Sequence, residues 1–473
     1  TTLHAPLQRF AVQTLTQHLR ELRGRHVEDG AIVVLDNRTG EVLAWVGSSG
    51  ALSRASEVDA VLAPRQPGST LKPFLYAQAI AEQRLTAASL LEDSAAHIPT
   101  ASGLYIPQNY DRSFKGWVSA RTALAASLNV PAVRTLVMVT PDAFFRQLQQ
   151  MGLPLRESGD YFGYSLALGS AEVSLLALTN TYRTLASGGR AGPVAPLAMP
   201  QPVMAGQGPA KSRPAPLPKS VQALDARAAF IVGDILSDAL ARARTFGTDS
   251  VLATRFWTAV KTGTSKDMRD NWAMGWSQHY TVGVWVGNAS GAPMWDVSGT
   301  SGAAPIWAAV MQHLHARLPS RAPVPPPGLV QAPVRFGNAL EAPRSEWFLQ
   351  GTQQAVFAID SVATGGDEAV ARDLKYPKGV KSQAAAASTA ARITEPATGT
   401  IIALDPDIPP NRQRLRLAAQ GQDLRWRIDG KDFAKGPQAQ WLPWPGRHQI
   451  TLVDGQGRVL DEVRVEVRGA GVK

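Results

Sequence analysis

The sequence contains no cysteine among its 473 residues. This absence excludes disulfide bonds, thiolate nucleophiles and zinc sites built on thiolates. The chain also lacks a run of 18 or more apolar residues, so no membrane-spanning helix is expected within it. The first ten residues, TTLHAPLQRF, have neither the basic nor the apolar region of a signal peptide. Because the chain starts without Met, we expect it to be a piece of a longer protein.

Charge of one sign is not concentrated anywhere along the chain. Lys and Arg number 48 against 38 Asp and Glu, a net charge of +10, but no basic run of the kind that binds nucleic acid occurs. We therefore expect no nucleic-acid partner. Hydrophobic residues make up 44 % and charged residues 18 %, which excludes a disordered or collagen-like chain. The length favours two or more domains.

The hydrophobic pattern of the first 316 residues predicts an α+β domain. Apolar residues at helical spacing predict an amphipathic helix over 5–23, and two strand-like runs around Asn37 and Gly40 predict a β-hairpin. Helical patterns dominate from about 69 to 188 and from about 225 to 243. Strand signals return in FWTAVKT, NWAMGWS and YTVGVWVGN, and a helix is expected near 303–316. The predicted antiparallel sheet thus pairs distant parts of the chain and is flanked by helices, with a helical subdomain in the middle.

Proline-rich segments divide the rest of the chain. The segment 190–219 is expected to be a surface excursion, and 319–333 to be a polyproline-like linker. Small residues at 383–389 predict a second hinge, and short alternating strands after it predict a small β-sandwich. We therefore expect three regions: a catalytic domain over 1–318, a linker and connecting segment over 319–387, and a β-sandwich over 388–473.

A serine and a lysine three positions apart stand where a loop becomes a helix, in the stretch PRQPGSTLKPF. Pro73 is poorly tolerated beyond the first turn of a helix, so the helix should begin at or just before Ser69. Lys72 then returns to the same face as Ser69. Burial of such a pair would favour a neutral amine able to take the serine proton. Alone the motif is weak, because about one S-x-x-K is expected by chance in a chain of this length.

Two further motifs follow in the order S-x-N and K-T-G. Ser127 and Asn129 lie at the end of one helical run and just before Pro131, in a predicted corner between helices. The second motif follows the strand FWTAV and consists of Lys261, Thr262, Gly263, Thr264 and Ser265. Gly263 has no side chain, so it leaves the strand edge open to a ligand. A peptide could add there as an extra strand, with its terminal carboxylate bound by the hydroxyls of Thr262 and Thr264 and by the ammonium of Lys261.

The ordered set S-x-x-K, S-x-N and K-T-G is typical of penicillin-binding proteins and serine β-lactamases. Residues 1 to about 316 resemble the transpeptidase domain of class A penicillin-binding proteins in GSTLKPF, SLN, KTGTS, EVSLLALTNTY and YTVGVWVGN. With the proline-rich boundary and the β tail, the whole chain is most similar to the penicillin-binding protein 1C branch. The resemblance implies the penicillin-binding, serine β-lactamase-like transpeptidase fold followed by an immunoglobulin-like β-sandwich, without the glycosyltransferase domain.

The resemblance also implies a role for each motif residue. Ser69 would be the acylated nucleophile and Lys72 its base, Ser127 would pass a proton to the leaving amine, and Asn129 would hold the donor peptide. Lys261 would supply positive potential beside Ser127. The rest of the K-T-G segment would bind substrate through Thr262, Gly263, Thr264 and Ser265, with the N–H groups of Thr264 and Ser69 as oxyanion hole.

The partners implied by the resemblance are peptidoglycan stem peptides and β-lactam antibiotics. An α2-macroglobulin-like periplasmic protein, or other envelope proteins, is the partner expected for the C-terminal module. The expected location is the periplasm, with anchoring to the inner membrane through an N-terminal segment outside this chain. Neither a cofactor nor a metal is expected.

Two alternatives share the motifs. A class A β-lactamase hydrolyses its acyl-enzyme with a Glu four residues before an Asn, but the glutamates between Ser127 and Lys261 are Glu157 and Glu172, and neither has that neighbour. We therefore favour D,D-transpeptidation through a serine acyl-enzyme. A catalytically weak scaffold that binds β-lactams is the second alternative, and covalent labelling by a fluorescent penicillin separates it from the enzyme.

Overall fold

The protein is described here by a computed structural model. It describes residues 1–100, 103–111, 113–195, 219–247, 250–359, 391–396, 400–403, 414–421, 423–444 and 446–468. The chain forms two compact units. The first comprises Thr1–Ser94 and Asn109–Ile359, and the second comprises Ala95–Gln108 and Asp360–Lys473.

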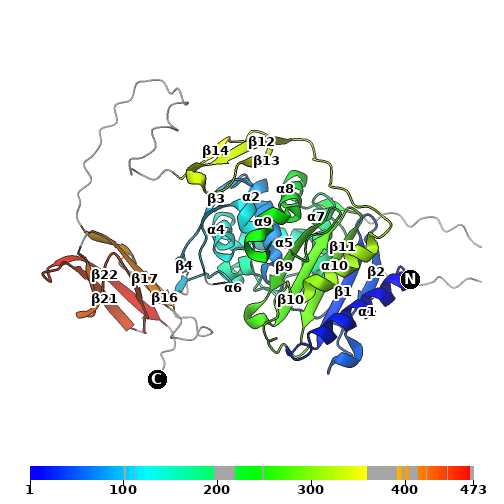
Figure 1. The fold of residues 1–473 in the computed structure, drawn as a ribbon, viewed down its shortest axis with the longest axis horizontal. Coiled ribbons are helices and arrows are strands. Elements are labelled where there is room, and N and C mark those ends of the chain that lie inside the picture. Colours follow the sequence, from blue (N-terminus) through cyan, green and yellow to red (C-terminus); the bar gives the residue numbers. More distant parts are fainter. Residues whose placement is uncertain are drawn as a thin grey trace, which may run out of the picture. The chain divides into compact units, whose positions relative to one another are not determined.

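An antiparallel sheet of five strands is the centre of the first unit, in the order β2-β1-β11-β10-β9 (Figure 1). The strands are β1 (Asp29–Asp36), β2 (Val42–Val46), β9 (Ala259–Thr264), β10 (Asp270–Trp276) and β11 (Tyr280–Gly287). β1 pairs with β2 as the predicted hairpin and with β11 on its other side, from Asp29 opposite Gly287 to Asp36 opposite Tyr280. The sheet therefore joins the first residues of the chain to residues some 250 positions later, as the sequence predicted, and leaves β9 at an edge.

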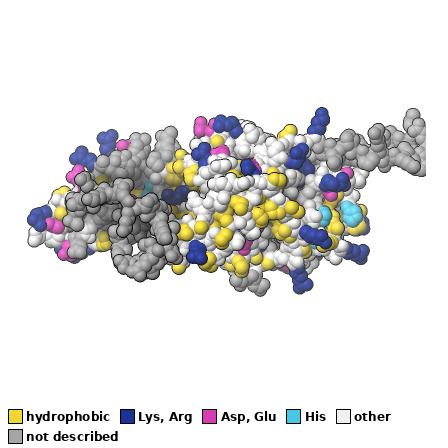
Figure 2. Space-filling model, turned by 90° about the horizontal axis from the view of Figure 1, so that it is seen from above, with side chains coloured by type: hydrophobic (Ala, Val, Ile, Leu, Met, Phe, Trp, Pro, Cys, Tyr) yellow, Lys and Arg dark blue, Asp and Glu magenta, His cyan; other side chains and the backbone are white. Residues whose placement is uncertain are grey.

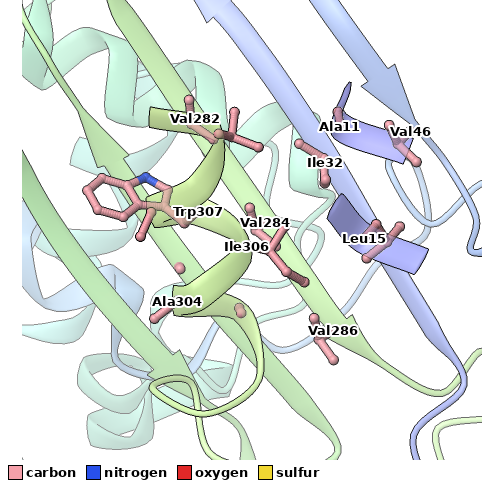
Figure 3. Close-up of a cluster of buried hydrophobic side chains, with 14 of the residues drawn as sticks. Ala11, Leu15, Ile32, Val46, Val282, Val284, Val286, Ala304, Ile306 and Trp307 are labelled. Carbon is pink, nitrogen blue, oxygen red and sulfur yellow. The ribbon is translucent and has the colours of Figure 1, made fainter. Parts of the chain in front are cut away.

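Two helices cover one face of this sheet with a common hydrophobic core. They are α1 (Ala5–Glu21), at the position predicted for the first helix, and α10 (Ala303–Leu314). Figure 3 shows side chains of α1, the sheet and α10 meeting in this core, among them Leu15, Ile32, Val284 and Ile306. The opposite face is covered by α7 (Leu175–Ala186) and α8 (Ala226–Ser237). A Cβ at Gly283 would lie 2.1 Å from Thr179 Oγ1, so this glycine lets α7 pack directly on β11.

The helical middle of the unit is less continuous than its pattern predicted. Its helices are the 3-10 turn η2 (Gly68–Leu71), α2 (Lys72–Ala81), α3 (Ala120–Ala125), α4 (Asn129–Val139), α5 (Pro141–Gln150), α6 (Gly159–Phe162), η3 (Gly163–Leu168) and α9 (Ala239–Phe246). Between α2 and α3 lie four short strands, β3 (Leu90–Asp93), β4 (Ile98–Thr100), β5 (Gly103–Tyr105) and β6 (Gly116–Ser119). β3 pairs with β6 in the first unit, whereas β4 pairs with β5 within residues 95–108, which belong to the second unit. Strands of three or four residues are too short to establish a period of two in the sequence.

The predicted proline-rich linker over 319–333 is only partly irregular, because its last five residues belong to a strand. β12 (Leu329–Phe336) pairs with β13 (Arg344–Leu349) and with β14 (Val356–Phe357). Pro333 lies within β12 opposite Ser345, and the proline signal concealed the alternation of Val334 and Phe336, which are buried. The sheet β13-β12-β14 belongs to the first compact unit. The boundaries at 318 and 387 stay predictions.

The excursion over 190–219 is described only at its ends. Its first residues form β7 (Arg190–Ala191), which pairs with β8 (Val221–Gln222) just after it. The rest of the excursion and the predicted hinge at 383–389 lie outside the described residues.

The second unit contains the two-stranded sheet β4-β5 and two larger sheets around one core. β15 (Arg392–Glu395), β17 (Leu415–Gln420) and β20 (Gln438–Trp441) form one sheet. The other consists of β16 (Thr400–Ala403), β22 (Val459–Arg468), β21 (Gly446–Val453), β18 (Arg425–Ile428) and β19 (Lys431–Lys435). Trp426 and Trp441 are buried in this core, whereas Trp444 is exposed. The strand-rich tail is as predicted, and two of its three tryptophans serve the core.

Charged side chains do not gather into a patch on the face shown in Figure 2. On the face shown in Figure 2, Lys and Arg side chains are dispersed among hydrophobic, acidic and uncharged ones. No helix in the described ranges is long and apolar enough to cross a membrane.

We expect a chain ending at Ala387 to keep the first unit folded. The large core between the sheet, α1 and α10 contains only residues between Leu7 and Met311, so removal of β15–β22 takes no side chain from it. The truncated chain should be soluble and should be acylated by benzylpenicillin within about tenfold of the full chain's rate. Stopped-flow fluorescence with a labelled penicillin measures this rate. An insoluble chain, or a larger loss, would place the domain boundary elsewhere.

Candidate active site

The predicted nucleophile lies in the 3-10 turn η2, directly before α2. The helical region thus begins at Gly68, as the position of Pro73 in the first turn of α2 required. The Tyr182 hydroxyl of α7 donates a hydrogen bond to the carbonyl of Thr70 at 2.7 Å and anchors the turn from below. Ser69 is partly exposed, and among the described residues its hydroxyl has no hydrogen-bond partner. A serine held in this way is open to a ligand.

Two glycines bring this turn against the sheet edge. Gly68 has φ +56°, and a Cβ there would lie 2.6 Å from the carbonyl oxygen of Thr264. A Cβ at Gly263 would lie 2.5 Å from the carbonyl oxygen of Pro67. The sequence suggested that Gly263 leaves room for a ligand, but the protein's own nucleophile turn occupies that space. Gly263 therefore sets the distance between β9 and Ser69.

The S-x-N motif forms the corner between α3 and α4, as predicted. Ser127 has φ +61°, a conformation that is costly for a residue with a side chain. Asn129 is the first residue of α4. Its N–H donates a hydrogen bond at 2.8 Å to the side-chain oxygen of Asn109, which lies 20 positions earlier in the sequence. The Asn109 amide in turn donates to both carboxylate oxygens of the buried Asp93, at 2.8 and 2.7 Å. This chain of hydrogen bonds fixes the corner against the strand β3.

Lys72 is fully buried and joins the nucleophile helix to this corner. Its ammonium nitrogen donates to the carbonyl of Ser127 at 2.8 Å and to Oδ1 of Asn129 at 2.6 Å. Burial holds the pKa of Lys72 well below its usual value, and the nearby Lys261 lowers this pKa further, against an opposing effect of Asp93. A neutral amine has two N–H donors and one lone pair. The two acceptors use both donors, and the lone pair remains to take a proton.

Lys261 connects the strand β9 to the same corner. It is buried, and its nitrogen donates to Oγ of Ser127 at 2.7 Å and to the carbonyl of Thr262 at 2.8 Å. Burial lowers the pKa of Lys261 to about 7, and the positive charge of the nearby Arg242 contributes. Because Ser127 Oγ accepts from Lys261, its own hydrogen can be given to another atom.

The remaining K-T-G residues lie at the outer edge of the sheet. Thr262 is nearly buried, and Thr264 is partly exposed and accepts the N–H of Gly299 at 3.0 Å. As the last strand of the sheet, β9 has one edge unpaired by other strands, which is the position for an added peptide strand. Ser265 differs from the prediction: its hydroxyl donates to Asp270 Oδ2 at 2.8 Å and accepts the Asp270 N–H at 2.9 Å. That hydroxyl therefore closes the turn into β10.

Sequence reasoning missed four residues that hold this site: Asp93, Asn109, Tyr182 and Arg242. None has a spacing that relates it to a motif residue, and each acts over a long stretch of chain. In the part of the chain that the structure describes, no group of three His, Asp or Glu side chains could hold a metal ion. Glu157 and Glu172 are both exposed, and Glu172 precedes the N-cap residue Ser174 of α7.

A Ser-x-x-Lys turn, an S-x-N corner and a K-T-G sheet edge, joined by two buried lysines, define the class of penicillin-recognising serine proteins. Comparison with known families places the chain more narrowly. Residues 30–312 match the model described as the penicillin binding protein transpeptidase domain. Residues 380–465 match the model of the penicillin-binding protein C-terminus family. The chain therefore belongs to the penicillin-binding proteins, and its resemblance to class A members is confirmed.

Named relatives agree with this assignment. Penicillin-binding protein 1C of Escherichia coli is 35 % identical over 311 residues, which are 65 % of this chain and 37 % of that protein. Penicillin-binding protein 1A of Neisseria meningitidis is 30 % identical over 300 residues, 60 % of this chain and 35 % of that protein. This chain thus spans little more than a third of the length of these relatives.

Solved structures agree with the fold. The crystal structure of penicillin-binding protein 1A from Haemophilus influenzae has a TM-score of 0.57 at 22 % identity, covering 69 % of this chain and 54 % of that one. PonA1 from Mycobacterium tuberculosis in complex with penicillin V has a TM-score of 0.55 at 20 % identity, covering 69 % and 88 %. The predicted α+β transpeptidase fold is therefore confirmed.

The pKa of Lys261 predicts a pH dependence. The charged form of Lys261 is present below its pKa of about 7 and is lost as the pH rises through that value. If this charge attracts the carboxylate of benzylpenicillin, as the resemblance implies, the second-order rate of acylation should fall as the pH rises above about 7. Rates measured from pH 5 to 10 test this.

The matched variant is Lys261→Arg, in which the side chain stays charged across this range. The acylation rate of this variant should not fall near neutral pH, whether or not it is slower than the wild type overall. If the same fall persists in the arginine variant, another group causes it.

Proposed function

We propose that this chain is a serine-type D-Ala-D-Ala transpeptidase that cross-links peptidoglycan stem peptides and is acylated by β-lactams. The observation that carries the proposal is the position of Lys72, a buried amine whose two donors are occupied and which lies one helical turn from Ser69. A serine hydroxyl is a weak nucleophile until a base takes its proton. A desolvated, neutral lysine is such a base.

In the proposed acylation, Ser69 Oγ attacks the carbonyl carbon of the penultimate D-Ala and its proton passes to Lys72. The bond to the terminal D-Ala nitrogen then breaks, and that nitrogen receives the Ser127 hydroxyl proton, which Lys72 restores. The product is an ester of Ser69 and free D-Ala. The amine of a second stem peptide attacks this ester, gives up a proton by the same route and regenerates Ser69. Reaction with a β-lactam stops at the ester because the leaving amine stays attached.

The proposed substrate site lies along β9. The terminal carboxylate binds to the hydroxyls of Thr262 and Thr264 in the positive potential of Lys261, and the donor peptide's amide meets Asn129. The N–H groups of Ser69 and Thr264 form the oxyanion hole. The close packing of Gly68 and Gly263 supports this, because it brings those two residues together.

The proposed location and partners follow from the relatives. The named relatives are penicillin-binding proteins, and one solved neighbour was crystallised with penicillin V. We therefore propose that this chain acts in the periplasm, as part of a membrane-anchored protein. For the immunoglobulin-like domain over 388–473 we propose a protein partner of the envelope, such as an α2-macroglobulin-like protein.

The residues four positions after Glu157 and Glu172 are Tyr161 and Leu176, so the Glu and Asn pair with which a class A β-lactamase hydrolyses its acyl-enzyme is missing, which argues against a β-lactamase. A weakly active scaffold would have the same fold, and labelling separates it from an enzyme.

Replacement of the nucleophile is the first test of this function. Ser69→Ala should abolish covalent labelling by a fluorescent penicillin, because it removes the hydroxyl that forms the ester, and the nearby Ser127 hydroxyl is held by Lys261. The melting temperature should change little, since Ser69 is only partly buried and its hydroxyl makes no hydrogen bond. Ser56→Ala, at an exposed serine, is the matched control and should label like the wild type. Labelling of the Ser69 variant at another serine would refute the assignment.

The K-T-G strand is tested separately. Thr262→Val and Thr264→Val keep the shape of the side chain but remove the hydroxyl, so each should slow acylation by benzylpenicillin about 10- to 100-fold, as expected for one lost hydrogen bond to a charged group. Acylation by a thioester without a carboxylate should change less than about threefold. Equal losses with both acyl donors would mean that the strand does not bind the carboxylate.

A further inference from the structure

The segment after α10 contains buried acidic residues that neither family match explains. The transpeptidase match ends at residue 312 and the C-terminal match begins at 380. Between them, Glu346 on β13 is completely buried and Glu341 is nearly so. Charged carboxylates are rarely buried unless they are paired, so their partners show what this sheet does.

Glu346 binds a helix of the catalytic domain. Arg121 on α3 donates to it through Nε at 2.8 Å and Nη2 at 2.7 Å, a bidentate pair across 225 positions of sequence. Arg121 is also nearly buried, and it reaches Asp234 of α8 and Asp238, the N-cap residue of α9. One guanidinium therefore joins β13, α3, α8 and α9. Such planar bidentate contacts fix orientation as well as distance.

Glu341 holds the N-terminal end of the same helix. Its carboxylate accepts the N–H and the hydroxyl of Ser119, the N-cap residue of α3, both at 2.8 Å. Arg344 completes this cluster by donating to Glu341 at 2.7 Å, to Glu346 at 2.6 Å and to Ser119 Oγ at 2.9 Å. The N-terminal end of α3 is thus held by the segment between β12 and β13.

The C-terminal end of α3 leads directly into the active site. Thr245 of α9 donates to the carbonyl of Ala126 at 2.9 Å, and the next residue is Ser127. α3 has only six residues, and a helix of that length is not stable on its own. Its position, and with it the strained backbone of Ser127, therefore depends on what holds its two ends.

We propose that Glu341 and Glu346 are a brace for the catalytic corner: these two residues hold α3 so that Ser127 meets both Lys72 and Lys261. In this role Arg121, Glu341 and Glu346 are positioning residues, since none of them reaches the substrate. The inference rests on the proposed serine acylation, which provides its readout. It assigns a catalytic contribution to a part of the chain outside the transpeptidase match.

The test is the rate of the acylation step after penicillin has bound. Glu346→Gln keeps the size of the side chain but leaves the Arg121 charge with only its two half-buried partners. At saturating penicillin, well below the melting temperature, acylation should be slower by about tenfold or more, a barrier change of about 1.4 kcal/mol. The dissociation constant of the non-covalent complex should change less than about threefold, because β9 is untouched.

Two further variants separate positioning from stability. Phe348→Leu alters the same strand, but the Phe348 ring packs in the cluster with Val334 and Phe336. It should lower the melting temperature without slowing acylation of the folded protein. Ser119→Ala removes one hydroxyl at the end of α3 and is the milder variant if Glu346→Gln does not fold. It should slow the acylation step about threefold with the dissociation constant unchanged.

The outcomes are distinct. A wild-type chain that penicillin does not label refutes the proposed function. A labelled wild type whose Glu346→Gln and Ser119→Ala variants acylate at the wild-type rate refutes the brace. So does a Phe348→Leu variant that slows acylation as much as Glu346→Gln does, because the effect would then be general loss of stability.

Discussion

The site depends on one buried amine. Lys72 has lost its contact with water and has gained two acceptors, the Ser127 carbonyl and the Asn129 side chain. Desolvation makes the charged form of an amine costly, so this burial creates a base from a residue that would be a cation in solution. The same two hydrogen bonds join the helix of the nucleophile to the S-x-N corner. Base strength and geometry therefore come from a single interaction.

The rest of the first unit keeps that interaction in place. Gly68 and Gly263 allow the nucleophile turn to press against β9, which positions Lys261 on the other side of Ser127. Asn109 and Asp93 hold the start of α4, and Ser127 retains a costly backbone conformation because elements on every side determine it. The proposed brace of Glu341 and Glu346 extends this support beyond the transpeptidase match. Burial lowers the pKa of both lysines; Lys261 lowers that of Lys72 further, and Arg242 does the same for Lys261.

Sequence alone predicted the sheet and the motif residues, because both are local signals. The hairpin β1–β2, the strands β9 to β11 and the helices α1 and α10 have clear periods, and Ser69 and Lys72 are close in the sequence. The supports of the site were not predictable in this way. Asn109 accepts the N–H of Asn129 across 20 positions of sequence, and Arg121 forms an ion pair with Glu346 across 225 positions. Their partners are chosen by tertiary packing, which leaves no pattern in one sequence. The prolines near β12 pointed to a linker, although β12 is the middle strand of a three-stranded sheet. Pro333 is tolerated there because β14 pairs only with Arg335 and Phe336, beyond the proline.

The most direct test of this account is the ionisation of Lys72 itself. In protein labelled with carbon-13 at lysine Cε, the Lys72 signal can be assigned from its loss in Lys72→Arg and followed by NMR as the pH changes. Burial between Ser127 and Asn129 predicts that Lys72 titrates well below the usual lysine pKa of about 10.4, apart from the exposed lysines. A Lys72 signal that titrates with the exposed lysines would contradict the account, because the amine would then be a cation at neutral pH and could not take the proton of Ser69.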